Sequence, residues 1–296
     1  MQTGYFYILG AGFAWSMLGI FINGLYSYGF VPMQIVSVRA TVAAVVLTIA
    51  LLFFKADLLK IKLRDLWLFI GTGLFSIIIS NYASFTAFKE VGISVGIILL
   101  YTSPVFVTLM AALIFKEPLT KRKVMALVMA LIGCALVSGI AQPGSVGKVN
   151  FNGLLMGLLS AFGYALYSIL GIFAIRAKYH PLTITVYTFI SAAVCGWFLT
   201  SPVQIVQQVV SIRILLLILG ISVLCSIVPY FLYAKGLESV EASKASILVC
   251  VEPAMAIVFG VTLYNEPFTF FMGLGVSAIL GAILLLNDNK PKMEEA

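Results

Sequence analysis

The chain has 296 residues, of which 62% are hydrophobic and only 10% are charged, whereas soluble domains have about 45–50% apolar and about 25% charged residues. This excess of apolar side chains cannot be buried inside one soluble domain of that length, so the composition excludes a soluble globular protein and predicts a chain surrounded by lipid. The formal net charge of +7 does not indicate a nucleic-acid-binding protein, because the basic residues stand in short loops between apolar runs.

Ten apolar runs follow one another along the chain, each of about the length that crosses a bilayer as a helix. The strands of a membrane barrel would instead alternate in polarity over about ten residues. The predicted spans are 4–26, 32–54, 66–88, 94–115, 124–140, 153–175, 182–200, 212–233, 245–264 and 268–286. A hydrophilic link at 142–150 and a polar tail at 287–296 lie outside them. The first run lacks a basic flank, so we expect no cleavable signal peptide.

The distribution of basic residues predicts the orientation. If the N-terminus is cytoplasmic, fourteen Lys and Arg residues, Lys123 among them, fall in cytoplasmic loops, and three fall on the opposite side, namely Lys89, Lys148 and Arg213. The remaining one, Arg39, lies inside the second span. Because cytoplasmic loops are enriched in Lys and Arg, both termini are expected in the cytoplasm.

One stretch of the chain occurs twice. Residues 94–120 and 243–269 align without insertions, and each is an apolar run with an internal proline that closes on Glu-Pro-x-Thr. The identical pairs are Ser94/Ser243, Ile98/Ile247, Leu99/Leu248, Pro104/Pro253, Glu117/Glu266, Pro118/Pro267 and Thr120/Thr269. The offset pairs the fourth span with the ninth, so the repeating unit has five helices. Since five is odd, the second copy is inverted in the membrane, an arrangement typical of secondary transporters with a substrate site between the repeats.

Two charged residues fall inside predicted spans, where a charge costs at least a few kcal/mol. Arg39 stands about seven residues into the second span; it could contact an anionic group of a substrate, or it could reach the outer interface or cap helix carbonyls. Glu252 stands near the middle of the ninth span. It could titrate, bind a cationic group or pair with Arg39, or it could brace a kink at Pro253 by accepting hydrogen bonds from freed backbone amides.

Prolines and aromatic residues supply the other candidates. Pro104 and Pro253 each remove a backbone hydrogen bond within a span, which predicts either gating half-helices or a static kink. Aromatic residues within spans are cavity candidates, whereas those near span ends are more often interface anchors. The cavity candidates are Trp15, Tyr101, Tyr164, Tyr167 and Tyr230.

Two Glu-Pro pairs, Glu117-Pro118 and Glu266-Pro267, are expected at turns between helices, where a carboxylate suits the positive end of the next helix.

The sequence contains little that could support enzymatic chemistry. The single histidine, His180, lies in a loop, and the four cysteines, Cys134, Cys195, Cys225 and Cys250, lie in apolar runs without metal-ligand spacing. No nucleophile elbow or phosphate-binding loop is present. We therefore expect no catalytic residues, no metal, no cofactor and no disulfide. Because the chain has no nucleotide-binding domain, transport would draw on a gradient.

The chain resembles the EamA family of the drug/metabolite transporter superfamily over residues 4–286. The resemblance rests on Lys-Glu-Pro-Leu-Thr (116–120), Asn-Glu-Pro-Phe-Thr (265–269), Cys-Val-Glu-Pro (250–253) and the pair Ala14-Trp15. It implies ten helices, two inverted repeats, a central cavity lined by both, and a structural motif at Pro104, Glu252 and Pro253. Members of the family that the chain resembles include exporters of amino acids and other metabolites.

The sequence therefore predicts an all-α, multi-pass protein of the cytoplasmic membrane with ten transmembrane helices. The predicted parts are a first repeat (1–141), a linker (142–151), an inverted second repeat (152–287) and a cytoplasmic tail (288–296). The expected function is export of a small metabolite, such as an amino acid, by alternating access. The alternatives are proton-coupled export of cationic drugs through Glu252, a passive channel-like facilitator and, least favoured, a membrane enzyme. The expected partners are a small-molecule substrate and the bilayer, with no nucleic acid; the oligomeric state is left open, with a monomer as the simplest case.

Overall fold

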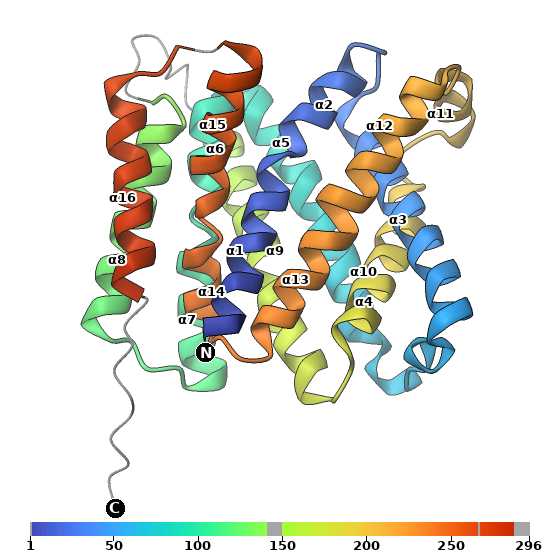
Figure 1. Cartoon of the computed structure of the whole chain (residues 1–296), viewed down its shortest axis with the longest axis horizontal. Helices are drawn as coiled ribbons and strands as arrows, with labels where there is room; N and C mark the ends of the chain where they lie inside the picture. Colours follow the sequence, from blue (N-terminus) through green and yellow to red (C-terminus); the bar gives the residue numbers. More distant parts are fainter. Residues whose placement is uncertain (1, 141–149, 266, 287–296) are drawn as a thin grey trace, which may run out of the picture.

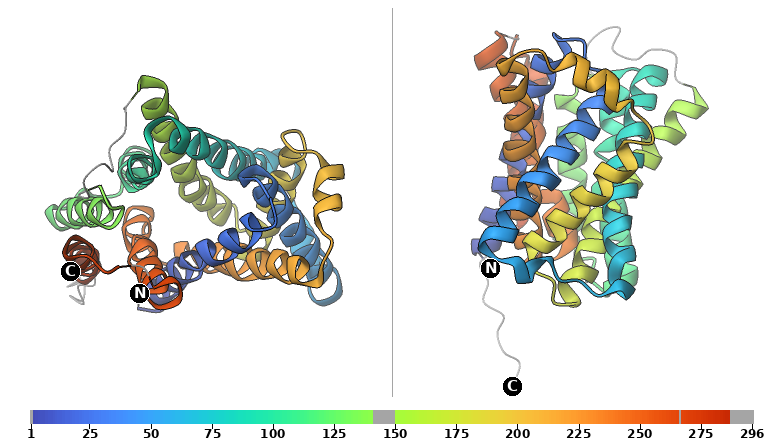
Figure 2. Two further views of the ribbon diagram at one scale, coloured as in Figure 1. Left: turned by 90° about the horizontal axis from the view of Figure 1, so that it is seen from above. Right: turned by 90° about the vertical axis from the view of Figure 1, so that its right-hand side faces the viewer.

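The computed structural model describes residues 2–140, 150–265 and 267–286, and every regular element in these ranges is helical. Figures 1 and 2 show the helices running across the molecule in one bundle, with α8 and α16 side by side at one edge. In the first half the helices are α1 (Gln2–Ser16), α2 (Leu18–Tyr26), α3 (Pro32–Phe54), α4 (Leu66–Gly73), α5 (Ser80–Val91), α6 (Ile93–Leu100), α7 (Ser103–Phe115) and α8 (Lys121–Val137). In the second half they are α9 (Phe151–Arg176), α10 (Pro181–Gly196), α11 (Pro202–Gln208), α12 (Ile212–Ser222), α13 (Val228–Leu237), α14 (Ala242–Leu248), α15 (Val251–Tyr264) and α16 (Phe270–Leu286).

Seven helical segments of the described chain are long and apolar enough to cross a membrane. They are Thr3–Tyr26, Pro32–Phe54, Leu63–Val91, Ile93–Phe115, Phe151–Arg176, Ile212–Leu237 and Ala242–Tyr264. The predicted fifth, seventh and tenth spans correspond to α8, α10 and α16, which are shorter. Short helix α11 was not predicted. Most of the predicted link at 142–150, and the tail at 287–296, fall outside the described residues.

The two halves share structural details at the same offset of 149 residues that relates their sequences. Residues 74–79 and 223–227 are both π-helical segments inside a longer helix. Lys116 and Asn265, which follow α7 and α15, both have left-handed backbone conformations, with φ of 56° and 53°. π-Helical segments are rare, and left-handed backbone conformations are uncommon for non-glycine residues. The match of both features at one offset therefore indicates a duplicated unit.

Close helix packing depends on small residues where two backbones meet. Gly133 of α8 faces Gly275 of α16, and a Cβ atom added to Gly133 would lie 2.8 Å from the Gly275 carbonyl oxygen. Helices α5 and α9 are joined by Ser160, whose carbonyl accepts a hydrogen bond of 2.8 Å from the Ser80 hydroxyl and whose own hydroxyl lies 2.6 Å from that of Ser84. Ser80 and Ser84, one helical turn apart on the third predicted span, therefore form a packing seam.

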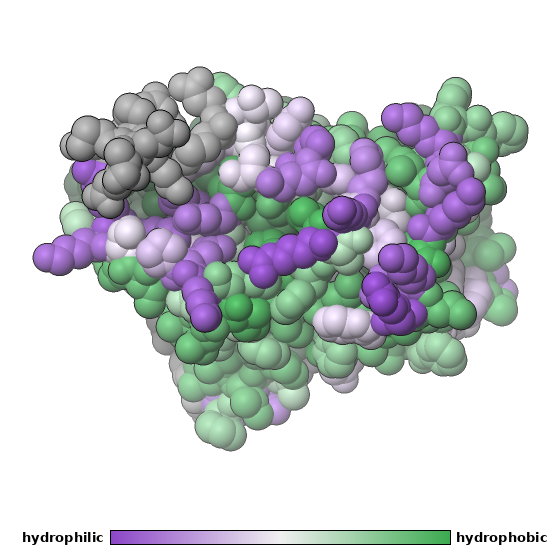
Figure 3. Space-filling model, turned by 90° about the horizontal axis from the view of Figure 1, so that it is seen from below, coloured by the Kyte–Doolittle hydropathy of each residue, from purple (hydrophilic) through white to green (hydrophobic). Residues whose placement is uncertain are grey.

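Both ends of the described chain lie at one face of the bundle (Figure 1). The Tyr5 hydroxyl of α1 donates a hydrogen bond of 3.2 Å to the carbonyl of Leu286 at the end of α16. We call this the terminal face. Figure 3 looks onto it and shows many hydrophilic side chains gathered there, whereas hydrophobic residues predominate around them. A polar end on an apolar body is the pattern of a protein that crosses a bilayer.

Replacing Gly73 of α4 with Ala is expected to destabilise the bundle. The added Cβ atom would lie 2.6 Å from both the Ala192 nitrogen and the Thr188 carbonyl oxygen, and these backbone atoms of α10 cannot move aside cheaply. Overpacking of this kind costs roughly 1–3 kcal/mol. Thermal unfolding of purified protein should show a lower midpoint. Gly19→Ala is the matched control, because no atom lies within 4 Å of its added Cβ; equal midpoints for the two variants would contradict this packing.

Candidate functional site

Three of the membrane-length segments are interrupted: Thr3–Tyr26 between α1 and α2, and one segment in each repeat at nearly equivalent positions. Helix α6 ends at Leu100 and α7 begins at Ser103, whereas α14 ends at Leu248 and α15 begins at Val251. Pro104 and Pro253 lie in the first turn of the second half-helix. Backbone N–H groups of a first turn have no acceptor within the helix, so a proline there costs no hydrogen bond. Both of these interruptions are only two residues long and keep right-handed backbone angles at Thr102 and Cys250, so the predicted alternatives of gating half-helices and a static kink both stay open.

A small cavity of about 50 Å³ lies where the two breaks approach each other. We call it the inner cavity. Helix α9 completes its wall with Tyr164 and Ser168, and α13 adds Tyr233. Its remaining lining residues, all from the two interrupted helices, are Leu100, Tyr101, Ser103, Pro104, Val107, Ser246, Val249, Cys250 and Glu252. Both halves of the chain thus contribute to the cavity, as the repeat predicts.

An aromatic cluster adjoins this cavity and is centred on Trp15 of α1. The Trp15 ring centroid lies 5.2 Å from that of Tyr230, 5.7 Å from that of Tyr233 and 6.4 Å from that of Tyr164. Tyr167 packs edge-on against Tyr230 at 5.0 Å. Aromatic packing at these distances stabilises the cluster, and two of its members, Tyr164 and Tyr233, line the inner cavity.

Tyr233 was missed by the sequence analysis. Its hydroxyl lies 2.8 Å from the Ser168 hydroxyl, and it lines the inner cavity directly. The signal that could have identified it is its spacing: Tyr233 follows Tyr230 by three residues and therefore shares its helix face.

Glu252 lines the inner cavity and is the only acidic residue that does so in the part of the chain that the structure describes. No hydrogen bond to its carboxylate is found from any described backbone amide, so the geometry does not favour the interpretation of Glu252 as a brace. No ion pair within 4.0 Å joins it to Arg39 either. A carboxylate surrounded by tyrosines is suited to a cationic group, which both the charge and the aromatic faces attract.

Arg39 lies in a second and larger cavity, of about 540 Å³, which we call the outer cavity. This cavity is open, and its wall contains Lys89 at the end of α5 and Tyr26 at the end of α2, so it is reached from the face opposite the terminal face. Leu100 lines both cavities and thus separates them. The described residues that line the outer cavity include Arg39 and Lys89 but no acidic side chain. The electrostatic potential in this cavity is therefore positive and favours anionic groups.

The predicted site residues therefore separate into two groups. Those in or beside the inner cavity are Trp15, Tyr101, Pro104, Tyr164, Tyr167, Tyr230, Glu252 and Pro253. Arg39 alone lies in the outer cavity, where its side chain is buried and only 7% exposed.

A bundle with interrupted helices that meet at an internal cavity is an arrangement typical of membrane transporters. Residues 2–139 and 151–288 each match the EamA-like transporter family, and the chain belongs to this family, within the drug/metabolite transporter superfamily. This is a family of transporters and not of enzymes, as predicted.

Similar proteins extend over most of the chain. An uncharacterized transporter of Archaeoglobus fulgidus is 26% identical over 265 residues, which cover 88% of this chain and 91% of that protein. The uncharacterized transporter YwfM of Bacillus subtilis is 30% identical over 72% of this chain and 70% of its own length. YyaM of the same organism is 27% identical over 94% and 92%, respectively. One crystal structure, 18% identical, has the same fold with a TM-score of 0.80 and 97% coverage of each chain.

Proposed function

We propose that the protein is a secondary active transporter that exports an amino acid or a related small metabolite across the cytoplasmic membrane by alternating access. The observation that carries this proposal is the inner cavity between two interrupted helices, one from each half of the chain. Half-helices that end at such a cavity can tilt separately, so access can change from one side to the other. In this proposal Pro104 and Pro253 mark the joints.

The membrane arrangement that we propose has ten transmembrane helices in two inverted repeats, with both termini cytoplasmic. Shorter helices α8, α10 and α16 would then cross with the seven longer ones. Two observations support this arrangement: the shared details at an offset of 149 residues, and the larger number of basic loop residues on the side of the termini. The terminal face would be cytoplasmic, and the outer cavity would open to the outside.

The substrate class follows from the charges of the two cavities. Glu252 in the inner cavity would bind an ammonium group, and Arg39 in the outer cavity would bind a carboxylate. A zwitterion fits this order of charges better than a simple cation or anion does, because each ion alone would bind only one of the two charged side chains. The tyrosine side chains that line the inner cavity with Glu252 would accept an apolar or aromatic side chain of the substrate.

A second candidate function is export of organic cations in exchange for protons. The specific observation in its favour is that Glu252 is the single charged side chain among the described residues of the inner cavity, with Tyr101 and Tyr164 beside it. A carboxylate in an aromatic cavity can bind either a proton or an organic cation, but not both, which would couple their fluxes.

Transport by purified protein in proteoliposomes tests these functions. Labelled amino acids and cationic dyes would be offered with and without a pH gradient, and with unlabelled substrate loaded on the opposite side. We expect saturable amino-acid flux that counter-loading accelerates. Flux that neither saturates nor responds to counter-loading would indicate a passive channel, and saturable dye flux that requires the pH gradient would favour the second candidate.

A further inference from the structure

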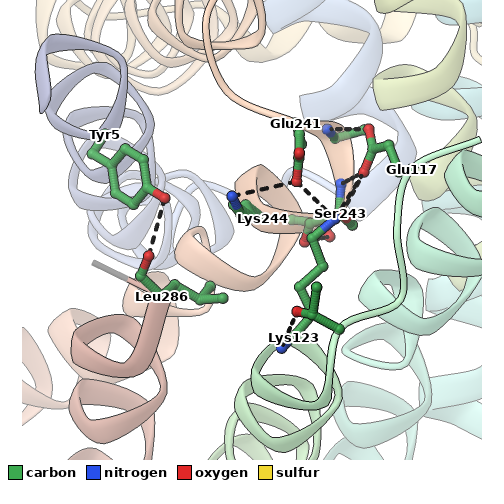
Figure 4. A network of polar contacts seen from close by, with 10 residues as sticks. Tyr5, Glu117, Lys123, Glu241, Ser243, Lys244 and Leu286 are labelled. Atoms are coloured by element: carbon green, nitrogen blue, oxygen red, sulfur yellow. Dashed lines mark hydrogen bonds and ion pairs between the residues drawn. The ribbon is translucent and has the colours of Figure 1, made fainter. Parts of the chain in front are cut away.

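A cluster of charged residues joins the two halves of the chain at the terminal face (Figure 4). Glu117, in the connection between α7 and α8, accepts hydrogen bonds from the backbone amides of Ala242 and Ser243, at 2.9 and 3.2 Å, and also from the Ser243 hydroxyl. The sequence predicts Glu117 in a turn, with its carboxylate near the positive end of the next helix, α8. The structure corrects this assignment, because the carboxylate reaches α14 of the other half instead.

Lys123 of α8 completes the contact. Its ammonium group lies 2.7 Å from the Glu241 carboxylate and 3.6 Å from that of Glu117, and its side chain is only 2% exposed. Lys244 lies 3.4 Å from Glu241. Burial works to raise the pKa of Glu241, but the ammonium groups of Lys123 and Lys244 outweigh it and lower that pKa, so this carboxylate is ionised at neutral pH. Removing Lys123 would leave two carboxylates close together without their shared cation.

This cluster is connected to the inner cavity through α14. The Ser246 hydroxyl donates a hydrogen bond of 3.0 Å to the carbonyl of Ser243, and Ser246 itself lines the inner cavity. Three residues of helix separate the two positions, or about 4.5 Å along its axis. A movement of α14 that opens the cavity toward the terminal face would therefore displace this helix from Glu117 and Lys123.

The ionic part of the cluster has no equivalent in the other repeat. At the offset of 149 residues, Ser243 corresponds to Ser94 and Glu117 to Glu266. The charged positions are not matched: Lys123 corresponds to Met272, Glu241 to Gly92 and Lys244 to Val95. If the two repeats exchange conformations, the state with a closed terminal face contains these ion pairs. The state with a closed opposite face has no charged residues at the positions equivalent to Lys123, Glu241 and Lys244, so the two states differ in free energy.

We propose that Glu117, Lys123, Glu241, Ser243 and Lys244 form a latch that holds the terminal face closed and makes the outward-open state the resting conformation. This inference rests on the proposed alternating access. The latch acts through a population shift: each state is accessible, and the unmatched ion pairs determine which one predominates without substrate.

The test measures the two conformations directly, in protein reconstituted without substrate. Spin labels would be attached in a background in which the four cysteines are replaced by Ser, and the label distances would be measured by pulsed electron resonance. One pair, at Leu119 and Glu238, spans the latch at the terminal face. A second pair, at Tyr28 and Ile93, spans the mouth of the outer cavity.

Lys123→Met introduces the residue that stands at the equivalent position of the other repeat. We expect it to lengthen the 119–238 distance, to shorten the 28–93 distance and to raise the ratio of inward-open to outward-open molecules about fivefold or more. Glu241→Gln, at a half-exposed position, should act in the same direction with little effect on folding. Lys60→Met is the matched control, because Lys60 pairs with Asp57 on exposed loop surface at the same face; it should change neither distance.

Unchanged distances in both Lys123→Met and Glu241→Gln would overturn the latch, whether or not the protein transports. An equal shift in Lys60→Met would also overturn it, because the effect would then follow surface charge alone. Flux measured on the same samples separates the two proposals. Shifted distances without any flux would retain the latch and refute the transport function that we propose.

Discussion

Replacing Glu252 with Gln should raise the KM for amino-acid transport about tenfold or more, while a related carboxylate without an amino group is transported as before. A charge-assisted hydrogen bond contributes roughly 1.5–3 kcal/mol, and Gln keeps the shape of the side chain but not its charge. Since the Glu252 carboxylate has no hydrogen-bond partner among the described residues, the substitution should leave the fold intact. Initial rates in proteoliposomes over a range of substrate concentrations measure the effect.

The control for this variant is Glu238→Gln, which removes a carboxylate that pairs with Lys235 at the molecular surface. Its transport should equal that of the parent. A normal KM in Glu252→Gln would refute the role of Glu252 in binding the ammonium group. Loss of pH-driven dye flux together with unchanged amino-acid flux would instead support the second candidate function, in which Glu252 carries the proton.

Replacing Arg39 with Gln should lower kcat/KM about a hundredfold for substrates that carry a carboxylate. Arg39 is buried in the wall of the outer cavity, without an acidic neighbour in that wall, so a substrate carboxylate would be its partner there. Arg binds carboxylates through two parallel hydrogen bonds, and Lys supplies only a point charge. Arg39→Lys should therefore recover part of the activity, and an amine without a carboxylate should be less affected by either change.

Lys89→Gln provides the matched comparison, because Lys89 lines the same cavity at its mouth. Because the Lys89 charge is closer to water, its removal should reduce kcat/KM less than the Arg39 change does. The reduction should be seen mainly at low ionic strength. If Arg39→Gln transports like the parent, Arg39 serves the structure by reaching the interface or capping carbonyls, as the alternative interpretation holds. If amines and carboxylates lose transport equally, the change has disturbed the cavity itself, and the assignment of Arg39 to the carboxylate is wrong.

The sequence by itself determined the class of protein, the positions of its helices and the offset of its repeat. These follow from local properties: an apolar run of about 20 residues must be helical in lipid, because only a helix satisfies its own backbone there. The Glu-Pro-x-Thr segments and the internal prolines are rare in this composition. Their alignment at a single offset therefore identified the duplication. Polar residues within spans, such as Arg39 and Glu252, were equally visible, because each costs free energy in a bilayer.

Tertiary structure decided which of these residues meet. Only the packed bundle separates Arg39 from Glu252 into two cavities and places Tyr233 beside Ser168. Lys123 illustrates the difference most clearly: in the sequence it is one of several basic residues after a span, yet in the fold it is buried between carboxylates from both halves. Such contacts depend on which helix faces pack together over more than a hundred residues of sequence separation, and a linear pattern of apolar and polar residues does not contain that information.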